Sequence, residues 1–521
     1  MRQVVLVGLC LLLGVAACKD DPSTPQHWEK RIGDAKGKKE KLKAIEDLRG
    51  SKHLTPVMLP MLEKRLTAEK NVEVKASLAR LLGEQKNASS VDALLDAVDP
   101  SGDSDSRGLN KEIAAALGAM GDPKAVPTLI RLLKTKDNYT TIAAIESLGR
   151  LKAKEAFAPL YEIANDEKIE PFITRKAIEA LGELGDPRAV PGLLKAMYRA
   201  KGFYREASFA LYELGQPAAE ALVAVVEKRD KALFDWGTQN GIQDFAILVK
   251  AIQVLGDLHE MRAEKAIVAL VPYKNEYDDL RIMMRTHAAD ALGRMRSKAG
   301  GKAIATVFDD PNPDARREYV WALARIGSKE PLAKLVETSA KGPWEARVES
   351  MRGVAMLADD PAVFDKFLAA EPKLFKAQCA EDDAAEGCHD RAGSVKSHLT
   401  RIKALAARAT AARACRDASD WAKRLDDPDE GVRERAAYEV GRSGQGALVG
   451  ELMKRLTEKN LDTRLAFIQG ADWLVHDAPQ ALAEAKKGAA TLAKQIAEER
   501  GKTEFDRVNE DLRRLLAKIS R

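Results

Sequence analysis

Apolar residues recur along this chain at the three- and four-residue intervals that are typical of amphipathic helices. Val190, Leu193, Leu194 and Met197 form one such stripe. Ala and Leu make up most of the apolar residues, a mix that favours close helix–helix packing over sheets. We find no convincing strand pattern, so the spacing predicts an all-α protein.

The helical pattern repeats. A Leu-Gly or Leu-Ala pair, replaced once by Val-Gly, recurs at steps that mostly lie between about 31 and 37 residues, as in two-helix repeats. We expect the Gly of this pair to end the first helix and permit a tight reversal. Asp186 before Pro187 is typical of the start of the second helix. The recurring positions are Gly83, Gly118, Gly149, Gly182, Gly256, Gly293, Ala324 and Gly441.

Two segments resemble HEAT repeats, especially the bacterial group related to the phycobilisome-lyase HEAT-like repeats. They are 427–441 (DPDEGVRERAAYEVG) and 310–316 (DPNPDAR). The resemblance extends over roughly residues 55–475 and implies an α-solenoid, a superhelix of antiparallel helix pairs. It also implies that acid–base pairs six positions apart form a structural ladder. These pairs are Asp427 and Arg433, Asp310 and Arg316, Asp279 and Arg285, and Glu69 and Lys75.

The first residues are typical of an exported protein. Arg2 precedes an apolar run over 4–17 that is too short to cross a bilayer comfortably. The run ends as VAAC, which resembles the lipobox of bacterial lipoproteins and implies that Cys18 is acylated after residues 1–17 are removed. The alternative is an ordinary signal peptide cleaved after Ala17. Lys19 stands where Asp is associated with inner-membrane retention, so we expect delivery to the outer membrane, with either the periplasm or the cell exterior as the facing side.

Breaks in the repeat divide the rest of the chain. The polar, Pro-containing segment after Cys18 is typical of a tether, and the largest break comes at 371–397. The expected order is a signal peptide (1–17), a lipid-proximal tether (18–30), a HEAT-like α-solenoid (31–370), a Cys-containing insertion with a long helix (371–414), further HEAT-like units (415–477) and a C-terminal helical cap (478–521).

The charge balance narrows the possible partners. Charged residues make up 31% of the chain, but the net charge is only +5, so nothing favours nucleic acid, which usually binds a concentrated basic face. No segment after the signal is long and apolar enough for a transmembrane helix. A lipid on Cys18 would therefore supply the membrane attachment.

Three cysteines remain in the folded part, and an oxidising compartment favours a disulfide between two of them. Cys379 and Cys388 enclose a short loop and are the easiest pair to join. Cys415 is then a buried free thiol or the partner in an alternative pairing. A metal site formed by Cys379, Cys388, His389 and His398 is the other possibility, but its spacing is too loose for a known zinc module. We expect neither a metal nor a cofactor.

His259-Glu260 resembles the His-Glu pairs of deoxyhypusine hydroxylases, HEAT-like enzymes that bind two irons through several such pairs. This chain has one pair, which cannot build a two-iron site. No phosphate-binding Gly-rich loop follows a strand, and no Gly-x-Ser-x-Gly elbow is present. We therefore expect that the chain is not an enzyme, and no small-molecule substrate is evident.

These observations predict a membrane-anchored envelope lipoprotein that acts as a protein–protein interaction scaffold through the solenoid surface. The second helix of each pair normally lines the concave face, which makes Tyr198 and Arg199 candidate contacts for a protein partner. Residues 228–243 lengthen one repeat and add Phe234 and Trp236 as candidates. The alternative is an enzyme or enzyme accessory acting on an envelope substrate such as peptidoglycan or another lipoprotein.

The lipid anchor can be tested directly. Cys18→Ala removes the only thiol that the lipobox-like sequence offers for acylation, so we expect the protein to lose its lipid and leave the membrane fraction. Mass spectrometry of the mature N-terminus and fractionation of the envelope measure both effects. An unmodified Cys18 in the wild-type protein would contradict the expectation.

Overall fold

The computed structural model describes residues 21–100, 107–199, 202–499 and 507–520, and Cys18 lies outside these ranges. Within them the chain forms helices and turns and no strand, so the prediction of an all-α solenoid is confirmed. The chain divides into two compact units, Met1–Pro217 and Ala218–Arg521. Each unit is described separately below.

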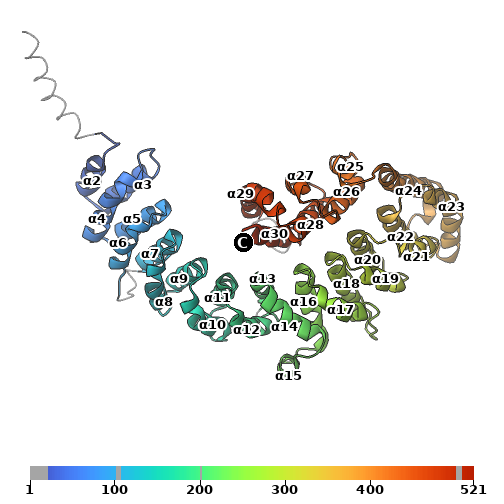
Figure 1. Ribbon diagram of the computed structural model, residues 1–521, viewed down its shortest axis with the longest axis horizontal. Helices are drawn as coiled ribbons and strands as arrows, with labels where there is room; N and C mark the ends of the chain where they lie inside the picture. The colour runs from blue at the N-terminus through green and yellow to red at the C-terminus, as the bar shows by residue number, and fades with distance from the viewer. Residues whose placement is uncertain (1–20, 101–106, 200–201, 500–506, 521) are drawn as a thin grey trace, which may run out of the picture. The chain divides into compact units, whose positions relative to one another are not determined.

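The first unit consists of two rows of helices (Figure 1). The inner helices are longer and pack directly against one another. The inner row contains α3 (Lys38–Arg49), α5 (Val72–Gln85), α7 (Arg107–Met120), α9 (Asn138–Arg150), α11 (Pro171–Leu184) and α13 (Tyr204–Leu214). The outer row contains α2 (Pro25–Gly33), α4 (Leu59–Ala68), α6 (Val91–Asp96), α8 (Val126–Leu132), α10 (Phe157–Asn165) and α12 (Val190–Ala196).

The row order corrects one expectation. In this unit the first helix of each pair lines the inner face, and the second helix lies outside it (Figure 1). Short 3-10 turns lead into five of the outer helices, and Asp186 accepts a hydrogen bond from the backbone N–H of Arg188 at one of them, Pro187–Ala189. The tether prediction also changes, because α2 begins at Pro25 and already buries Trp28.

The recurring glycines have a different role from the one expected. A Cβ on Gly182 would lie 2.7 Å from Ala210 Cα on the next inner helix, and one on Gly83 would lie 2.6 Å from Ala116 Cβ. Each glycine therefore lets two successive inner helices approach closely. The reversal occurs three positions later, where Gly185 and Lys152 adopt positive φ angles of 68° and 51°.

The second unit starts with helices stacked in the same way, in which α16, α18, α20 and α22 pack on one another in turn. Its opening helices are α14 (Gln216–Val226), α15 (Lys231–Gln239), α16 (Asp244–Asp257), α17 (Glu264–Leu270), α18 (Asp278–Arg294), α19 (Lys298–Val307), α20 (Pro313–Ile326), α21 (Leu332–Thr338) and α22 (Trp344–Leu357). The chain then continues through α23 (Val363–Glu381), α24 (Arg391–Ala414), α25 (Ala418–Ala422), α26 (Glu430–Arg442), α27 (Val449–Met453), α28 (Leu461–Asp477), α29 (Ala481–Glu499) and α30 (Arg507–Ser520).

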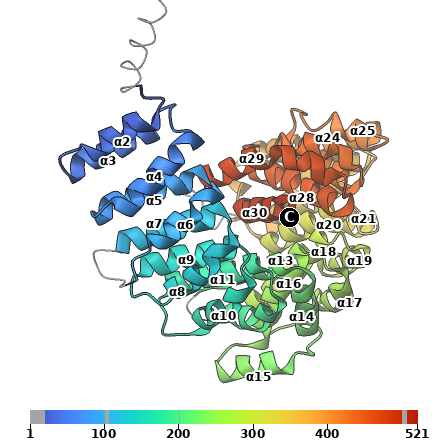
Figure 2. The same ribbon diagram turned by 60° about the vertical axis from the view of Figure 1, so that its left-hand side comes forward.

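After α24 the chain of the second unit folds back on itself. Figures 1 and 2 both show α26 and α28 beside α18 and α20. Trp473 on α28 donates a hydrogen bond of 2.9 Å to the carbonyl oxygen of Arg294 on α18. Arg442 on α26 donates to the carbonyl oxygens of Ala324 and Arg325 at the end of α20. The sequence led us to expect that the later repeats continue the stack. They instead pack back against earlier helices of the same unit.

The C-terminal helix belongs to the core of the second unit. Helix α30 packs against α28 and α29 and buries Val508, Leu512, Leu515 and Ile519 in the hydrophobic core of this unit.

Among the described residues, no single helix is long and apolar enough to cross a membrane, although the bent pair α13 and α14 meets both criteria together.

The glycine contact gives a testable prediction. Gly182→Ala places a methyl group against Ala210, which we expect to lower the free energy of unfolding by about 1–3 kcal/mol despite the better helix propensity of Ala. Urea unfolding followed by circular dichroism measures the change. Gly108→Ala on α7 is the matched control, because nothing lies within 4 Å of its added Cβ. Equal effects of the two substitutions would contradict the close-approach role.

Candidate functional site

Two inner helices of the first unit, α9 and α11, each carry an exposed aromatic side chain. Tyr139 is 69% exposed and Phe172 is 44% exposed. Each residue lies ten positions before the Gly that contacts the next inner helix, Gly149 for Tyr139 and Gly182 for Phe172. The two side chains therefore occupy equivalent places on neighbouring helices, whose axes are about 8–10 Å apart. We call Tyr139 and Phe172 the aromatic pair.

Ion pairs connect the inner helices of this unit. Arg80 on α5 donates two hydrogen bonds of 3.0 Å to Glu112 on α7, and Lys176 on α11 lies 2.9 Å from Glu146 on α9. Burial, together with the charge of Glu179, raises the pKa of Glu183 at the end of α11. The inner helices thus combine exposed aromatic rings at the N-termini of α9 and α11 with charged side chains farther along the helices.

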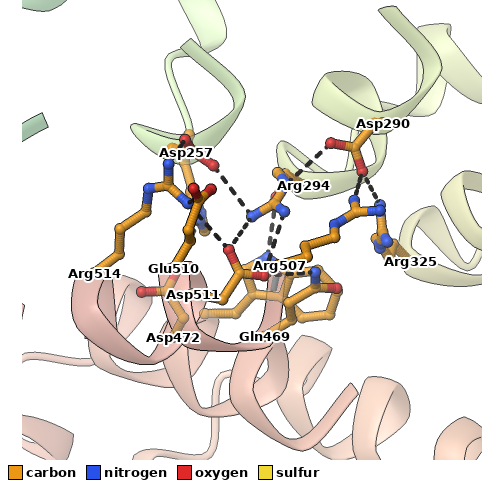
Figure 3. A network of polar contacts seen from close by, with 12 residues as sticks. Asp257, Asp290, Arg294, Arg325, Gln469, Asp472, Arg507, Glu510, Asp511 and Arg514 are labelled. Atoms are coloured by element: carbon orange, nitrogen blue, oxygen red, sulfur yellow. Dashed lines mark hydrogen bonds and ion pairs between the residues drawn. The ribbon is translucent and has the colours of Figure 1, made fainter. Parts of the chain in front are cut away.

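The corresponding face of the second unit is filled by α30 (Figure 3). Arg294 on α18 lies 2.9 Å from Asp511 of α30 and 3.1 Å from Asp257 of α16. Arg514 of α30 lies 2.9 Å from the same Asp257. Arg507 of α30 pairs with Asp290, which also pairs with Arg325. Within the first unit, no described segment covers the inner helices in this manner.

The buried charges of this network shift the pKa values of its carboxyl groups. Burial raises the pKa of Asp257 to about 6, against the opposing effect of Arg514 and Arg294. Burial would also raise the pKa of Asp290, but three guanidinium groups hold it well below its usual value. Paired buried charges contribute little net stability, yet losing one partner is costly. The network therefore fixes where α30 lies.

A pocket of about 420 Å³ opens between α20, α22 and the insertion, in the second unit. His398 lines it, and its Nδ1 lies 3.0 Å from an oxygen of the fully buried Glu371. The imidazole stacks on Trp344 at 3.6 Å. Arg347 donates two hydrogen bonds, of 2.6 and 3.2 Å, to the Glu371 carboxylate. Burial lowers the pKa of His398, against the opposing effect of Glu371, and so favours the neutral ring.

The predicted cysteine pair lies beside this pocket. Cys379 and Cys388 form a disulfide in the structure, and both pack on Phe375. Cys415 is free and half-buried, and burial raises the pKa of its thiol. The disulfide occupies both sulfurs of the alternative metal set. The described residues contain no group of three or more His, Cys, Asp or Glu side chains placed to hold a metal ion.

The His259-Glu260 pair has two structural roles. His259 Nε2 lies 2.8 Å from Asp472 on α28, and Glu260 accepts hydrogen bonds from Arg262 at the start of the next outer helix. Neither side chain points to a shared metal site in the described part of the chain. The arrangement does not fit the repeated iron-binding pairs of the hydroxylases that the dipeptide resembles.

The four predicted partner contacts are placed as follows. Tyr198 and Arg199 follow the outer helix α12. Tyr198 is only 6% exposed, and the half-buried Arg199 donates hydrogen bonds to Ala164 and Asn165. Phe234 and Trp236 are half-buried on the short helix α15. Tyr198 and Arg199 became candidates because the second helix of each pair was expected on the concave face, and in this unit that helix lies in the outer row.

The predicted acid–base ladder forms with different partners. Arg433 and Arg316 donate to the backbone carbonyl oxygens of Asp427 and Asp310, rather than to their carboxylates. The Asp310 carboxylate instead lies 3.4 Å from Arg285 of the preceding repeat.

The pocket could not be predicted from the sequence, because its lining residues come from positions between 313 and 401 that share no local motif.

Comparison with known proteins agrees with this architecture. The family model described as HEAT repeats matches residues 59–148, 133–212 and 275–352. Over these three segments the chain is similar to HEAT repeats.

Two curated relatives have enzyme names. Phycocyanobilin lyase subunit alpha of Nostoc sp. (strain PCC 7120 / SAG 25.82 / UTEX 2576) is 30% identical over 163 residues, 28% of this chain and 58% of that protein. The matched region thus covers less than two thirds of the lyase subunit. Deoxyhypusine hydroxylase-B of Oryza sativa subsp. japonica is 28% identical over 240 residues, 45% of this chain and 72% of that protein.

The solved complex of CpcE and CpcF of phycocyanin lyase from Nostoc sp. PCC7120 is 22% identical, with a TM-score of 0.28, and the match covers 49% of this chain and 94% of that one. The enzyme names of these relatives contradict our expectation that the chain is not an enzyme. That expectation rested on the lack of local motifs. A repeat protein can instead assemble its chemistry from helices of several repeats, where no local motif appears.

His259 gives a pH-dependent prediction. Burial, followed by the charge of Lys518, lowers its pKa to about 4 from 6.5. The unfolded chain therefore binds a proton between pH 6.5 and 4 that the folded chain excludes, so this stabilisation is present above pH 6.5 and is lost as the pH falls towards 4. We expect a loss of about 3 kcal/mol over that interval in the wild type that is missing in His259→Asn.

Asn is chosen because it tolerates the positive φ of 55° at this position. Urea unfolding at several pH values gives the free energies, and the opposite contribution of Asp257 cancels because both proteins contain it. His389→Asn, at an exposed position, is the control. Identical pH profiles for the wild type and His259→Asn would show that the buried imidazole is not responsible.

Proposed function

We propose that this chain is a protein-interaction scaffold that is tethered to the bacterial cell envelope, at the outer membrane, by a lipid on Cys18. The inner face of the first unit binds the partner protein, and the aromatic pair supplies the central contacts. The lipobox-like sequence supports the tether, and the following polar segment gives the folded part room to reach a partner.

The observation that carries this proposal is the exposure of Tyr139 and Phe172 at equivalent positions on adjacent inner helices. Large aromatic side chains dominate the energetics of protein interfaces, and two of them in one row suit an extended apolar ridge on a partner. The family match over 59–212 covers most of the unit that presents them. Stacked helical repeats offer such extended surfaces to protein partners.

The name of the lyase relative favours a second candidate function. That relative is a subunit, and the solved lyase structure is a complex of two chains. By analogy, this chain would be one subunit of an enzyme complex, with the partner held on the same inner face. This candidate predicts that the partner gains catalytic activity in the complex. An unchanged activity contradicts it and leaves the scaffold proposal standing.

The scaffold proposal is tested by site-specific photocrosslinking in intact cells. A photoreactive phenylalanine analogue at position 172 is expected to capture one defined envelope protein. The same analogue at Glu162, an exposed position on the outer helix α10, is expected to capture none. Capture of the same protein from both positions, or from neither, would contradict the assignment of the inner face.

The affinity of the chain for the captured protein tests the contribution of the aromatic pair. Replacing both Tyr139 and Phe172 with Ser is expected to weaken binding at least about tenfold, because aromatic contacts at the centre of an interface cost more than 1 kcal/mol each when removed. Tyr277→Ser is the matched control, since Tyr277 is 64% exposed but belongs to the second unit. Both proteins should unfold at the wild-type temperature.

A further inference from the structure

Several charged side chains line the pocket in the second unit. Glu345, Glu386 and Arg401 line it, and none of them has a hydrogen bond or an ion pair among the described residues. Arg317, also in the lining, has only a 3.5 Å contact with Asp314. Both signs of charge are therefore available to a bound molecule.

The pocket also has an apolar part. Trp344, Val348 and Pro313 contribute to the lining together with these charges. Trp344 is held in place on two sides, because its backbone N–H donates a 3.0 Å hydrogen bond to Gln378 and its ring stacks on His398. A fixed ring beside charged side chains suits a ligand that has both an apolar and a charged part, and the volume of about 420 Å³ lies in the usual range for small-ligand sites.

Two buried groups make this a built site. Glu349 lines the pocket although it is only 5% exposed, and its nearest cation, Arg352, is 3.4 Å away. His398 is fixed by Glu371 through Nδ1, and its Nε2 has no hydrogen bond within the described part of the chain. The neutral imidazole thus offers one hydrogen-bonding nitrogen to the pocket. An imidazole held by a buried carboxylate has a defined orientation.

We propose that this pocket binds a small zwitterion, a free amino acid or a peptide of two or three residues. Its ammonium group is held by Glu345, Glu349 and Glu386, and its carboxylate by Arg401 and Arg317. Its apolar side chain lies against Trp344 and Val348. His398 accepts or donates one hydrogen bond through Nε2. This inference is independent of the proposed partner binding, because every residue it uses belongs to the second unit.

The full chain, purified in detergent, is titrated by calorimetry with L-phenylalanine, L-leucine and the dipeptide Ala-Phe. At least one of these probes is expected to bind with a Kd below about 1 mM. N-acetyl-phenylalanine lacks the ammonium group and phenylalanine amide lacks the carboxylate. Each is expected to bind at least about tenfold more weakly than phenylalanine, because each leaves one set of pocket charges unpaired.

Paired variants assign the binding to this pocket. Arg401→Gln and Glu345→Gln are each expected to raise the Kd of the probe about tenfold. The controls are Arg391→Gln and Glu381→Gln, exposed residues of the same segment that do not line the pocket, and they should bind like the wild type. All four side chains are exposed, so folding is not at risk, and unchanged unfolding temperatures verify it.

Three results would overturn the proposal. The first is that none of the three probes binds at 10 mM, a concentration about ten times the expected Kd. The second is that the two capped derivatives bind as well as phenylalanine. The third is that Arg401→Gln binds no worse than Arg391→Gln. Failure of the photocrosslinking experiment on the first unit would leave these results unaffected.

Discussion

The close contact between small residues of successive inner helices is the constraint on which this structure depends. At Gly83, Gly182 and Gly256, an added Cβ would fall within 2.6–2.8 Å of an alanine on the next inner helix. Helices can approach this closely only where side chains are almost absent. Because the inner helices touch while the shorter outer helices stand farther apart, each unit acquires a defined inner face. The candidate binding residues of the first unit and the docking place of α30 in the second both lie on such faces.

The inner helices are covered by another helix in the second unit and exposed in the first. In the second unit α30 buries four aliphatic side chains and brings Arg507, Asp511 and Arg514 into a network with three inner helices. The cost of removing these charges from water is offset only because each has an opposite partner. In the first unit the equivalent helices present Tyr139 and Phe172 to solvent. We infer that one inner face is occupied by the chain itself and the other is available to another molecule.

The sequence predicted the features that depend on local spacing. Helix stripes, the Asp186 cap and the period of the repeat all arise within about 35 residues, and they led to the correct fold class. The expectation that the second helix of each pair lies in the inner row was wrong for the first unit, since either row can bury its apolar stripe and local spacing does not distinguish them. The contact between Arg294 and Asp511 joins residues 217 positions apart, and no local pattern marks such a pair. The pocket was missed for the same reason, because α20, α22 and α24 meet there only after the chain has folded.

Helix α30 covers the inner helices of the second unit. Hydrogen–deuterium exchange on the intact chain, followed by mass spectrometry, measures whether it stays docked there. We expect the amides of 507–520 to exchange as slowly as those of α16, α18 and α28, because docked helices open only together with the helices that support them. Exchange of 507–520 at the rate of an unstructured segment, with the inner helices still protected, would contradict it.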